Sequence, residues 1–152
     1  MLSFSKFVPL ALQEQKDKYL LVTADLTLAA WNTVAAHRVA TVVGTCRLVV
    51  IPYIRIAAVG ASGTYILGVT GATNAWVAST AVAAMLIDTT WLSTTPAKTY
   101  ALTSVHDRIV TGANVLYTIG TTAASAGALD FYIWYEPLLP GSYVQPGTGQ
   151  ST

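Results

Sequence analysis

Charged residues are scarce in this chain and absent from two long stretches of it. The 152 residues include eight Lys or Arg and seven Asp or Glu, and residues 56–87 and 109–129 carry no charge. A typical soluble domain is about a quarter charged, whereas this chain is 10% charged and 53% hydrophobic. A single domain of this size has too much surface to bury all of its apolar side chains in one core. The composition therefore predicts a subunit whose surface is partly covered by other chains.

The same composition argues against several classes of partner. The net charge is +1, so no strong field attracts nucleic acid or an anionic membrane surface. A membrane-spanning helix needs about 20 consecutive apolar residues, and glycines and prolines interrupt every apolar run here before that length. Residues 7–12 are too short for the apolar part of a signal peptide. We therefore expect no nucleic-acid partner, no membrane partner and no cleaved secretion signal.

The run of residues 45–56 predicts a long strand. Its even positions (Cys46, Leu48, Val50, Ile54, Ile56) are apolar, while Arg47 and Arg55 lie at odd positions, which is the period of a half-buried strand. Pro52 cannot donate a ladder hydrogen bond, so we expect it at a sheet edge or in a bulge. Valines at 39, 42 and 43 indicate a preceding strand, joined through Gly44 by a tight turn or bulge.

The last third of the chain predicts a hairpin made of residues 108–119 and 128–136. In the second run one face carries Leu129, Phe131, Ile133 and Tyr135, and the other carries Asp130, Tyr132, Trp134 and Glu136. The first face is expected in the core. The second is either another buried layer or a contact surface, because Tyr and Trp are favoured at interfaces.

Together these patterns predict an all-β, mainly antiparallel fold: a β-sandwich or a jelly-roll or barrel-like domain. Residues 64–69 are a further strand, and residues 75–87 fit either a helix or a strand. We divide the chain into an N-terminal arm and first strand (1–25), a β-rich core (26–136) and an extended C-terminal arm (137–152). The apolar N-terminal end favours an arm docked on its own or a neighbouring domain. The C-terminal end fits either a disordered tail or an arm laid on a neighbouring subunit.

No catalytic, cofactor-binding or metal-binding site is expected. His106 and Asp107 are adjacent, and neighbours along a strand point to opposite faces. Cys46 is the sole cysteine, so a cysteine-based metal cluster is excluded and a buried thiol is predicted. The two histidines and seven acidic residues show no metal-ligand spacing.

Three segments resemble those of capsid decoration proteins of tailed bacteriophages: residues 42–48 (VVGTCRL), 67–69 (LGV) and 126–138 (AGALDFYIWYEPL). The resemblance extends over about residues 34–139. It implies a β-sandwich or barrel-like subunit that forms a homotrimer, binds the major capsid protein on the capsid exterior and stabilises the shell. It also implies terminal arms that hold neighbouring copies, no enzymatic activity, and synthesis in the host cytoplasm.

Pattern alone selects the candidate interface residues, which are Phe4, Phe7, Arg47, Tyr53, Arg55, Tyr132, Trp134, Leu138, Leu139 and Tyr143. The alternative function is a tail or spike module that binds a host glycan or receptor through an exposed tryptophan beside an acid. Trp76, Trp91 and Trp134 are the candidates for that role.

Overall fold

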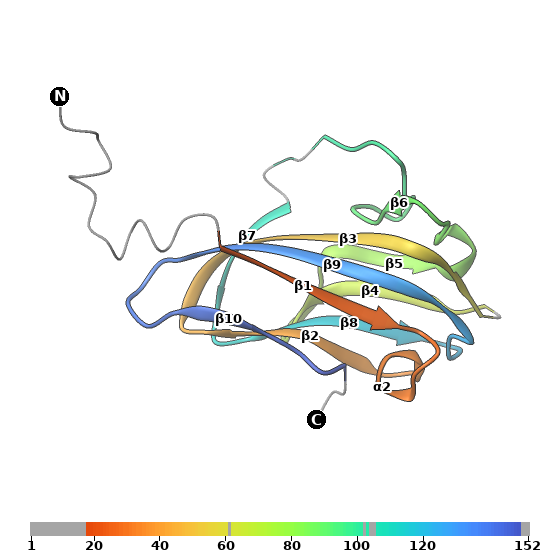
Figure 1. Cartoon of the computed structure of the whole chain (residues 1–152), viewed down its shortest axis with the longest axis horizontal. Coiled ribbons are helices and arrows are strands. Elements are labelled where there is room, and N and C mark those ends of the chain that lie inside the picture. Colours follow the sequence, from red (N-terminus) through yellow and green to blue (C-terminus); the bar gives the residue numbers. More distant parts are fainter. Residues whose placement is uncertain (1–17, 61, 102, 104–105, 150–152) are drawn as a thin grey trace.

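Alternating apolar and polar side chains build two antiparallel sheets that pack face to face in a computed structural model of the chain (Figure 1). The structure describes residues 18–60, 62–101, 103 and 106–149. Sheet A has the strand order β1-β9-β3-β6, with β7 also paired to β3, and sheet B has the order β10-β2-β8-β4-β5. The predicted all-β fold is confirmed, as a sandwich.

In chain order the elements are β1 (Lys18–Asp25), α2 (Ala29–Asn32), β2 (Ala36–Val43), β3 (Thr45–Val59), β4 (Thr64–Val69), β5 (Ala72–Ala81), a 3₁₀ turn (Val82–Ala84), β6 (Thr89–Thr90), β7 (Asp107–Thr111), β8 (Asn114–Gly120), β9 (Ala126–Pro137) and β10 (Tyr143–Pro146).

The alternation in β3 has the predicted sense over most of its length. Cys46, Leu48, Val50 and Ile54 are fully buried, and both arginines lie on the opposite face. The prediction is wrong at Ile56, which is 48% exposed. The register against β9 shifts between Ile54 and Ile56, and a shift of one residue turns a side chain to the other face.

Gly44 carries the chain from sheet B to sheet A between β2 and β3. Its φ of +73° is in the left-handed region, which glycine adopts without steric cost. A Cβ at this position would lie 2.3 Å from Oγ of Ser142. The predicted tight turn is therefore present, but it joins strands of opposite sheets.

The predicted edge or bulge position of Pro52 is wrong. β3 lies between β9 on one side and the short strands β6 and β7 on the other, and Pro52 is in regular register with Phe131. The carbonyl of Pro52 accepts a hydrogen bond from the N–H of Trp91 (2.8 Å), so the proline nitrogen also faces away from β9. On that side Pro52 lies at the end of the stretch paired with β6 and beyond the stretch paired with β7, so its missing N–H falls where the pairing passes from one short strand to the other.

The predicted hairpin of residues 108–119 and 128–136 is also wrong. The first run divides into β7 in sheet A and β8 in sheet B, while the second run is β9 in sheet A. β8 and β9 therefore face each other across the sandwich, with the ring centroids of Tyr117 and Phe131 5.7 Å apart. The sequence pattern does not distinguish the two arrangements, because strands packed face to face and strands paired side by side both have one apolar face.

The core centres on Tyr117 of β8. Its ring lies 5.1 Å from that of His37, 5.9 Å from that of Tyr65 and 6.3 Å from that of Trp31, measured between centroids. Its hydroxyl donates a hydrogen bond to the carbonyl of Trp31. Burial raises the pKa of Tyr117 above its usual value and that of Tyr65 to about 12, so both phenols stay neutral.

The structure resolves the ambiguity of residues 75–87, whereas it leaves the N-terminal arm untested. Of the ambiguous segment 75–87, residues up to Ala81 belong to strand β5, and a single 3₁₀ turn follows. The N-terminal arm lies outside the described residues, apart from β1 at its end.

The C-terminal segment adds a strand to its own sheet. β10 pairs with β2 of the same chain, and Gly149 exchanges backbone hydrogen bonds with Arg38 (3.1 and 3.2 Å). The inward-facing Val144 is 5% exposed. The sandwich thus continues to residue 149, beyond the boundary drawn at 136, because this segment extends the edge of sheet B and buries an apolar side chain.

Candidate interaction surface

The outer face of sheet A carries an apolar area in two rows across three strands. In register, Tyr19 of β1, Trp134 of β9 and Val49 of β3 form one row, and Leu21, Tyr132 and Ile51 form the next. We call these six side chains the aromatic patch. They point outward because their neighbours along each strand, such as Val22, Ile133 and Val50, point into the core.

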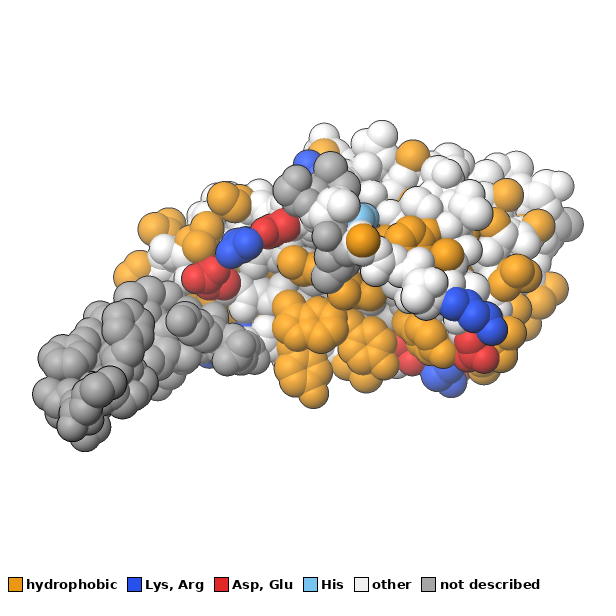
Figure 2. Space-filling model, turned by 90° about the horizontal axis from the view of Figure 1, so that it is seen from above, with side chains coloured by type: hydrophobic (Ala, Val, Ile, Leu, Met, Phe, Trp, Pro, Cys, Tyr) orange, Lys and Arg blue, Asp and Glu red, His pale blue; other side chains and the backbone are white. Residues whose placement is uncertain are grey.

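Stacked rings form the centre of the aromatic patch. The Trp134 ring lies 6.2 Å from that of Tyr19 and 6.1 Å from that of Tyr132, with interplanar angles of 26° and 24°. Tyr19 is 63% exposed, Leu21 48% and Trp134 43%. Figure 2 shows hydrophobic side chains gathered on this side of the molecule, with groups of charged side chains to either side. An exposed and contiguous apolar area of this kind is typical of a binding surface.

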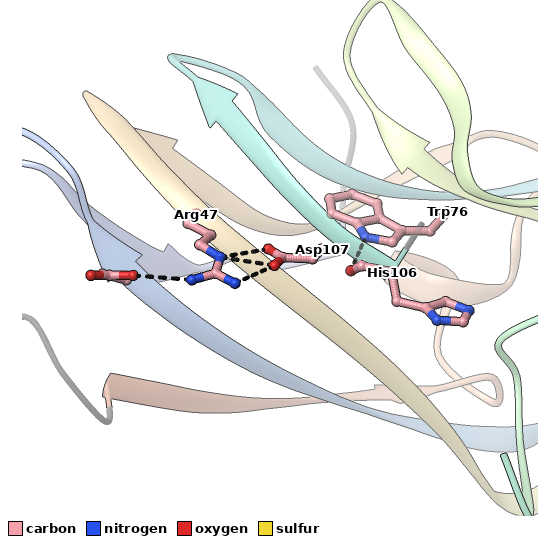
Figure 3. A network of polar contacts seen from close by, with 5 residues as sticks. Arg47, Trp76, His106 and Asp107 are labelled. Atoms are coloured by element: carbon pink, nitrogen blue, oxygen red, sulfur yellow. Dashed lines mark hydrogen bonds and ion pairs between the residues drawn. The ribbon is translucent and has the colours of Figure 1, made fainter. Parts of the chain in front are cut away.

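One group of charges centres on Arg47 (Figure 3). Its guanidinium nitrogen Nε donates to both carboxylate oxygens of Asp107 (2.8 and 2.9 Å), and Nη1 lies 3.6 Å from a Glu136 oxygen. This hydrogen bonding to Arg47 lowers the pKa of Asp107 below its usual value. The three side chains come from β3, β7 and β9, whose register places them side by side.

The second group of charges lies farther along β3. Arg55 Nε is 3.1 Å from an Asp130 oxygen, and the same carboxylate accepts a hydrogen bond from the Thr23 hydroxyl (2.8 Å). Nearby, the Tyr53 hydroxyl donates to Asp88 (2.7 Å), and this bond raises the pKa of Tyr53. Both arginines are therefore matched with acids, and the two ends of the face present mixed rather than single-sign charge.

The structure brings half of the predicted interface residues together. Arg47, Tyr53, Arg55, Tyr132 and Trp134 all lie on the outer face of sheet A. Leu138 and Leu139 are exposed just after β9, and Tyr143 is 46% exposed on β10 in the other sheet. The predicted Phe4 and Phe7 lie outside the described residues.

Sequence reasoning missed Tyr19 and Leu21, which complete the aromatic patch at the edge of sheet A. The apolar run of Leu20, Leu21 and Val22 hides the alternation of β1, so the sequence does not indicate which side faces out. Sequence reasoning also missed Ile109 of β7, which is opposite Arg47 in the register and 69% exposed. As in β1, adjacent apolar residues hide which side of the strand faces out.

Two of the three tryptophans considered for glycan binding are buried. Trp91 is fully buried and its indole N–H donates to the Thr80 hydroxyl (3.0 Å). Trp76 is 7% exposed and donates to the backbone carbonyl of His106 (3.1 Å; Figure 3). Of these three tryptophans, Trp134 is therefore the one with a ring available to an external ligand.

His106, Asp107 and Cys46, the side chains considered above for catalysis or metal binding, all have a structural environment that accounts for them. His106 bonds to Thr103 and lies 3.4 Å from the Leu92 carbonyl, while Asp107 binds Arg47 on the outer face. Burial raises the pKa of the Cys46 thiol and keeps it protonated. The part of the chain that the structure describes contains no group of three or more His, Cys, Asp or Glu placed to hold a metal ion. Nor does that part contain a helix of the length and apolarity needed to cross a bilayer.

An open depression of about 370 Å³ lies at the turn end of the sandwich, lined by residues that include Gly44, Thr70 and Gly112. Its polar groups bond to one another, since the Thr41 hydroxyl donates to the Asn114 side chain (2.9 Å). No charged side chain lines it. The outer face of sheet A remains the stronger candidate surface.

Comparisons with protein-family models, curated proteins and solved structures found no match to this chain. The resemblance to phage decoration proteins therefore stays a prediction.

Proposed function

We propose that this chain is a structural virion protein, a decoration protein that binds the exterior of a phage capsid through the aromatic patch and stabilises the shell. The observation that carries the proposal is the exposed stack of Tyr19, Trp134 and Tyr132 between two groups of ion pairs. Protein interfaces have this organisation, with aromatic anchors at the centre and polar groups at the rim. The scarcity of charge elsewhere supports a chain that functions packed against others.

The proposed partner is the major capsid protein in its assembled form. A subunit that binds only the assembled shell stabilises it by mass action, by RT ln(1 + [L]/Kd). Trp134 and its stacked neighbours supply the apolar contact area. Arg47 and Arg55, each beside a carboxylate, set the register of docking because only a surface with matching charges meets both groups favourably.

A second candidate is recognition of a glycan on the same face. It is favoured by one observation: the flat rings of Tyr132 and Trp134 lie on the same strand face as the carboxylates of Asp130 and Glu136. Aromatic faces offer apolar contact area to a sugar ring, and carboxylate oxygens accept hydrogen bonds from hydroxyl groups.

Co-sedimentation with shells assembled from the major capsid protein of the virus that encodes this chain tests the proposal. We expect saturable binding, an increase in the melting temperature of the shell, and a loss of affinity of roughly 30-fold or more for Trp134→Ala, the usual cost of removing an interface hot spot. Tyr143→Phe, on the other sheet, is the control and should bind as the unmodified chain does. Absence of saturable binding, or equal affinity of Trp134→Ala, contradicts it. Quenching of Trp134 fluorescence by a host polysaccharide instead favours glycan recognition.

A further inference from the structure

The free edges of the two sheets differ in how well they are protected from pairing with another strand. β10 has four residues and ends in a proline, and β6 has only two residues. β5 is long, but its register against β4 shifts twice and Arg108 covers the carbonyl of Ala75 (2.5 Å). Short length, proline, bulges and charge are the usual means of blunting an edge.

Between its charged end residues, β1 has none of these features. It is eight residues long, contains no proline, and pairs with β9 without a register shift. Residues 19–24 carry no charge. Two apolar side chains on this strand, Tyr19 and Leu21, are 63% and 48% exposed.

The hydrogen bonding around β1 shows which backbone groups are free. Leu26 donates to the carbonyl of Gly127 (3.0 Å), which continues the β1–β9 ladder by one pair. Because residues of an antiparallel ladder face the partner strand alternately, the even-numbered residues of β1 face β9. The N–H and C=O groups of Tyr19, Leu21 and Thr23 therefore point away from the sheet. Among the described residues nothing bonds to them, whereas the Asp25 carbonyl already accepts from Leu28 (3.0 Å).

We propose that β1 pairs antiparallel with β1 of a second copy of this chain, about a two-fold axis at Leu21. In this register Leu21 faces Leu21 of the other copy, and Tyr19 faces Thr23. Every free N–H and C=O of these three residues then finds a partner. A shift by two residues in one direction brings Tyr19 opposite Asp25, whose carbonyl is occupied. The same shift in the other direction brings Thr23 opposite residue 17, which lies outside the described residues.

Charge and surface continuity agree with this arrangement. β1 has Lys18 at one end and Asp25 at the other, so antiparallel pairing brings the opposite charges of the two copies to the same end. The row of Leu21, Tyr132 and Ile51 continues across the axis into the same row of the second copy. Sheet A and its aromatic patch thereby double in width. The pairing does not depend on the proposed function, and it gives a dimer where the decoration-protein resemblance implies a trimer.

Light scattering behind a sizing column, over a dilution series of the full chain, measures the assembly. We expect a dimer that dissociates on dilution. Leu21→Pro removes the N–H at the axis without touching the β1–β9 ladder, and the loss of its two symmetric hydrogen bonds should weaken the dimer roughly 30-fold. Leu21→Val keeps the backbone donor and should dimerise as the unmodified chain does. A monomer or a trimer at all concentrations overturns the proposal.

Two cysteine variants test the same pairing by cross-linking, so the proposal remains testable if Leu21→Pro fails to fold. Leu21→Cys places two thiols across the axis at a Cα separation of about 5.5 Å, within the range of a disulfide. Leu28→Cys is the control, since Leu28 is exposed and lies outside β1. We expect mild oxidation to give a covalent dimer of Leu21→Cys well before the control. Equal rates for the two variants contradict pairing through β1, and buried Cys46 contributes no background.

Discussion

Alanine substitutions at Trp134 and Phe131 separate the contact surface from the core, because the two residues lie on opposite faces of the same strand. Phe131 is fully buried, and Phe→Ala in a core costs about 3–5 kcal/mol of folding free energy. Trp134 is 43% exposed and so buries roughly 100 Å² of its side chain. At ~25 cal/mol per Å², reduced by up to 40% for a compact denatured state, Trp134→Ala should cost ~1.5–2.5 kcal/mol.

Urea unfolding followed by circular dichroism measures both costs, and it avoids the loss of a fluorophore in Trp134→Ala. Because self-association adds to apparent stability, all proteins are compared at one chain concentration. We expect unchanged m-values and the larger loss at Phe131. A loss at Trp134 equal to or greater than that at Phe131 would refute the reasoning, because the outer face would then hold the fold together instead of being free for a partner.

Three further predictions concern turns, charge and the buried histidine. Gly44→Ala should lower the urea midpoint more than Gly141→Ala does. Both glycines have φ above +70°, but an added Cβ meets other atoms only at Gly44. Equal losses would show that backbone strain alone sets the cost and that the contact with Ser142 does not contribute. The lowered pKa of Asp107 means that its bond with Arg47 is intact above about pH 4 and is lost as the pH falls through the lowered pKa. An NMR titration of the Asp107 carboxyl carbon should therefore have a midpoint below the usual value, and Arg47→Gln should move it upward. His37→Phe keeps the ring stacking but removes the ring N–H, whose possible acceptors are the carbonyl oxygens of Ala30, Thr33 and Gly149. Amide exchange in residues 143–149 should speed up, and unchanged exchange would contradict this role.

The sequence predicts which face of a strand is buried better than it predicts which strands lie next to each other in a sheet. In β3 and β9 the period of two separates Leu48 and Phe131, which are buried, from Arg47 and Trp134, which are not. That signal is local, because each side chain alternates with the pleat of its own strand. Which strand lies beside it is decided by contacts distant in sequence, and a buried face has the same pattern whether its partner is in the same sheet or across the core.

The candidate surface shows the same division. The sequence predicts that Arg47, Tyr53 and Arg55 share one face of their strand and that Tyr132 and Trp134 share one face of theirs, which is either buried or a contact surface. Their assembly into one area depends on the β3–β9 register. The addition of Tyr19 depends on β1 joining β9 at the sheet edge, and no periodicity within β1 indicates that.

Oxidative footprinting of the chain alone and bound to assembled shells tests the central claim most directly, because it measures which side chains become covered. Tyr19, Tyr132 and Trp134 report on the aromatic patch, and Tyr143 on the opposite sheet is the internal reference. The account predicts that oxidation of the three patch residues falls on binding while that of Tyr143 is unchanged. Protection of Tyr143 with an unprotected Trp134 would contradict it.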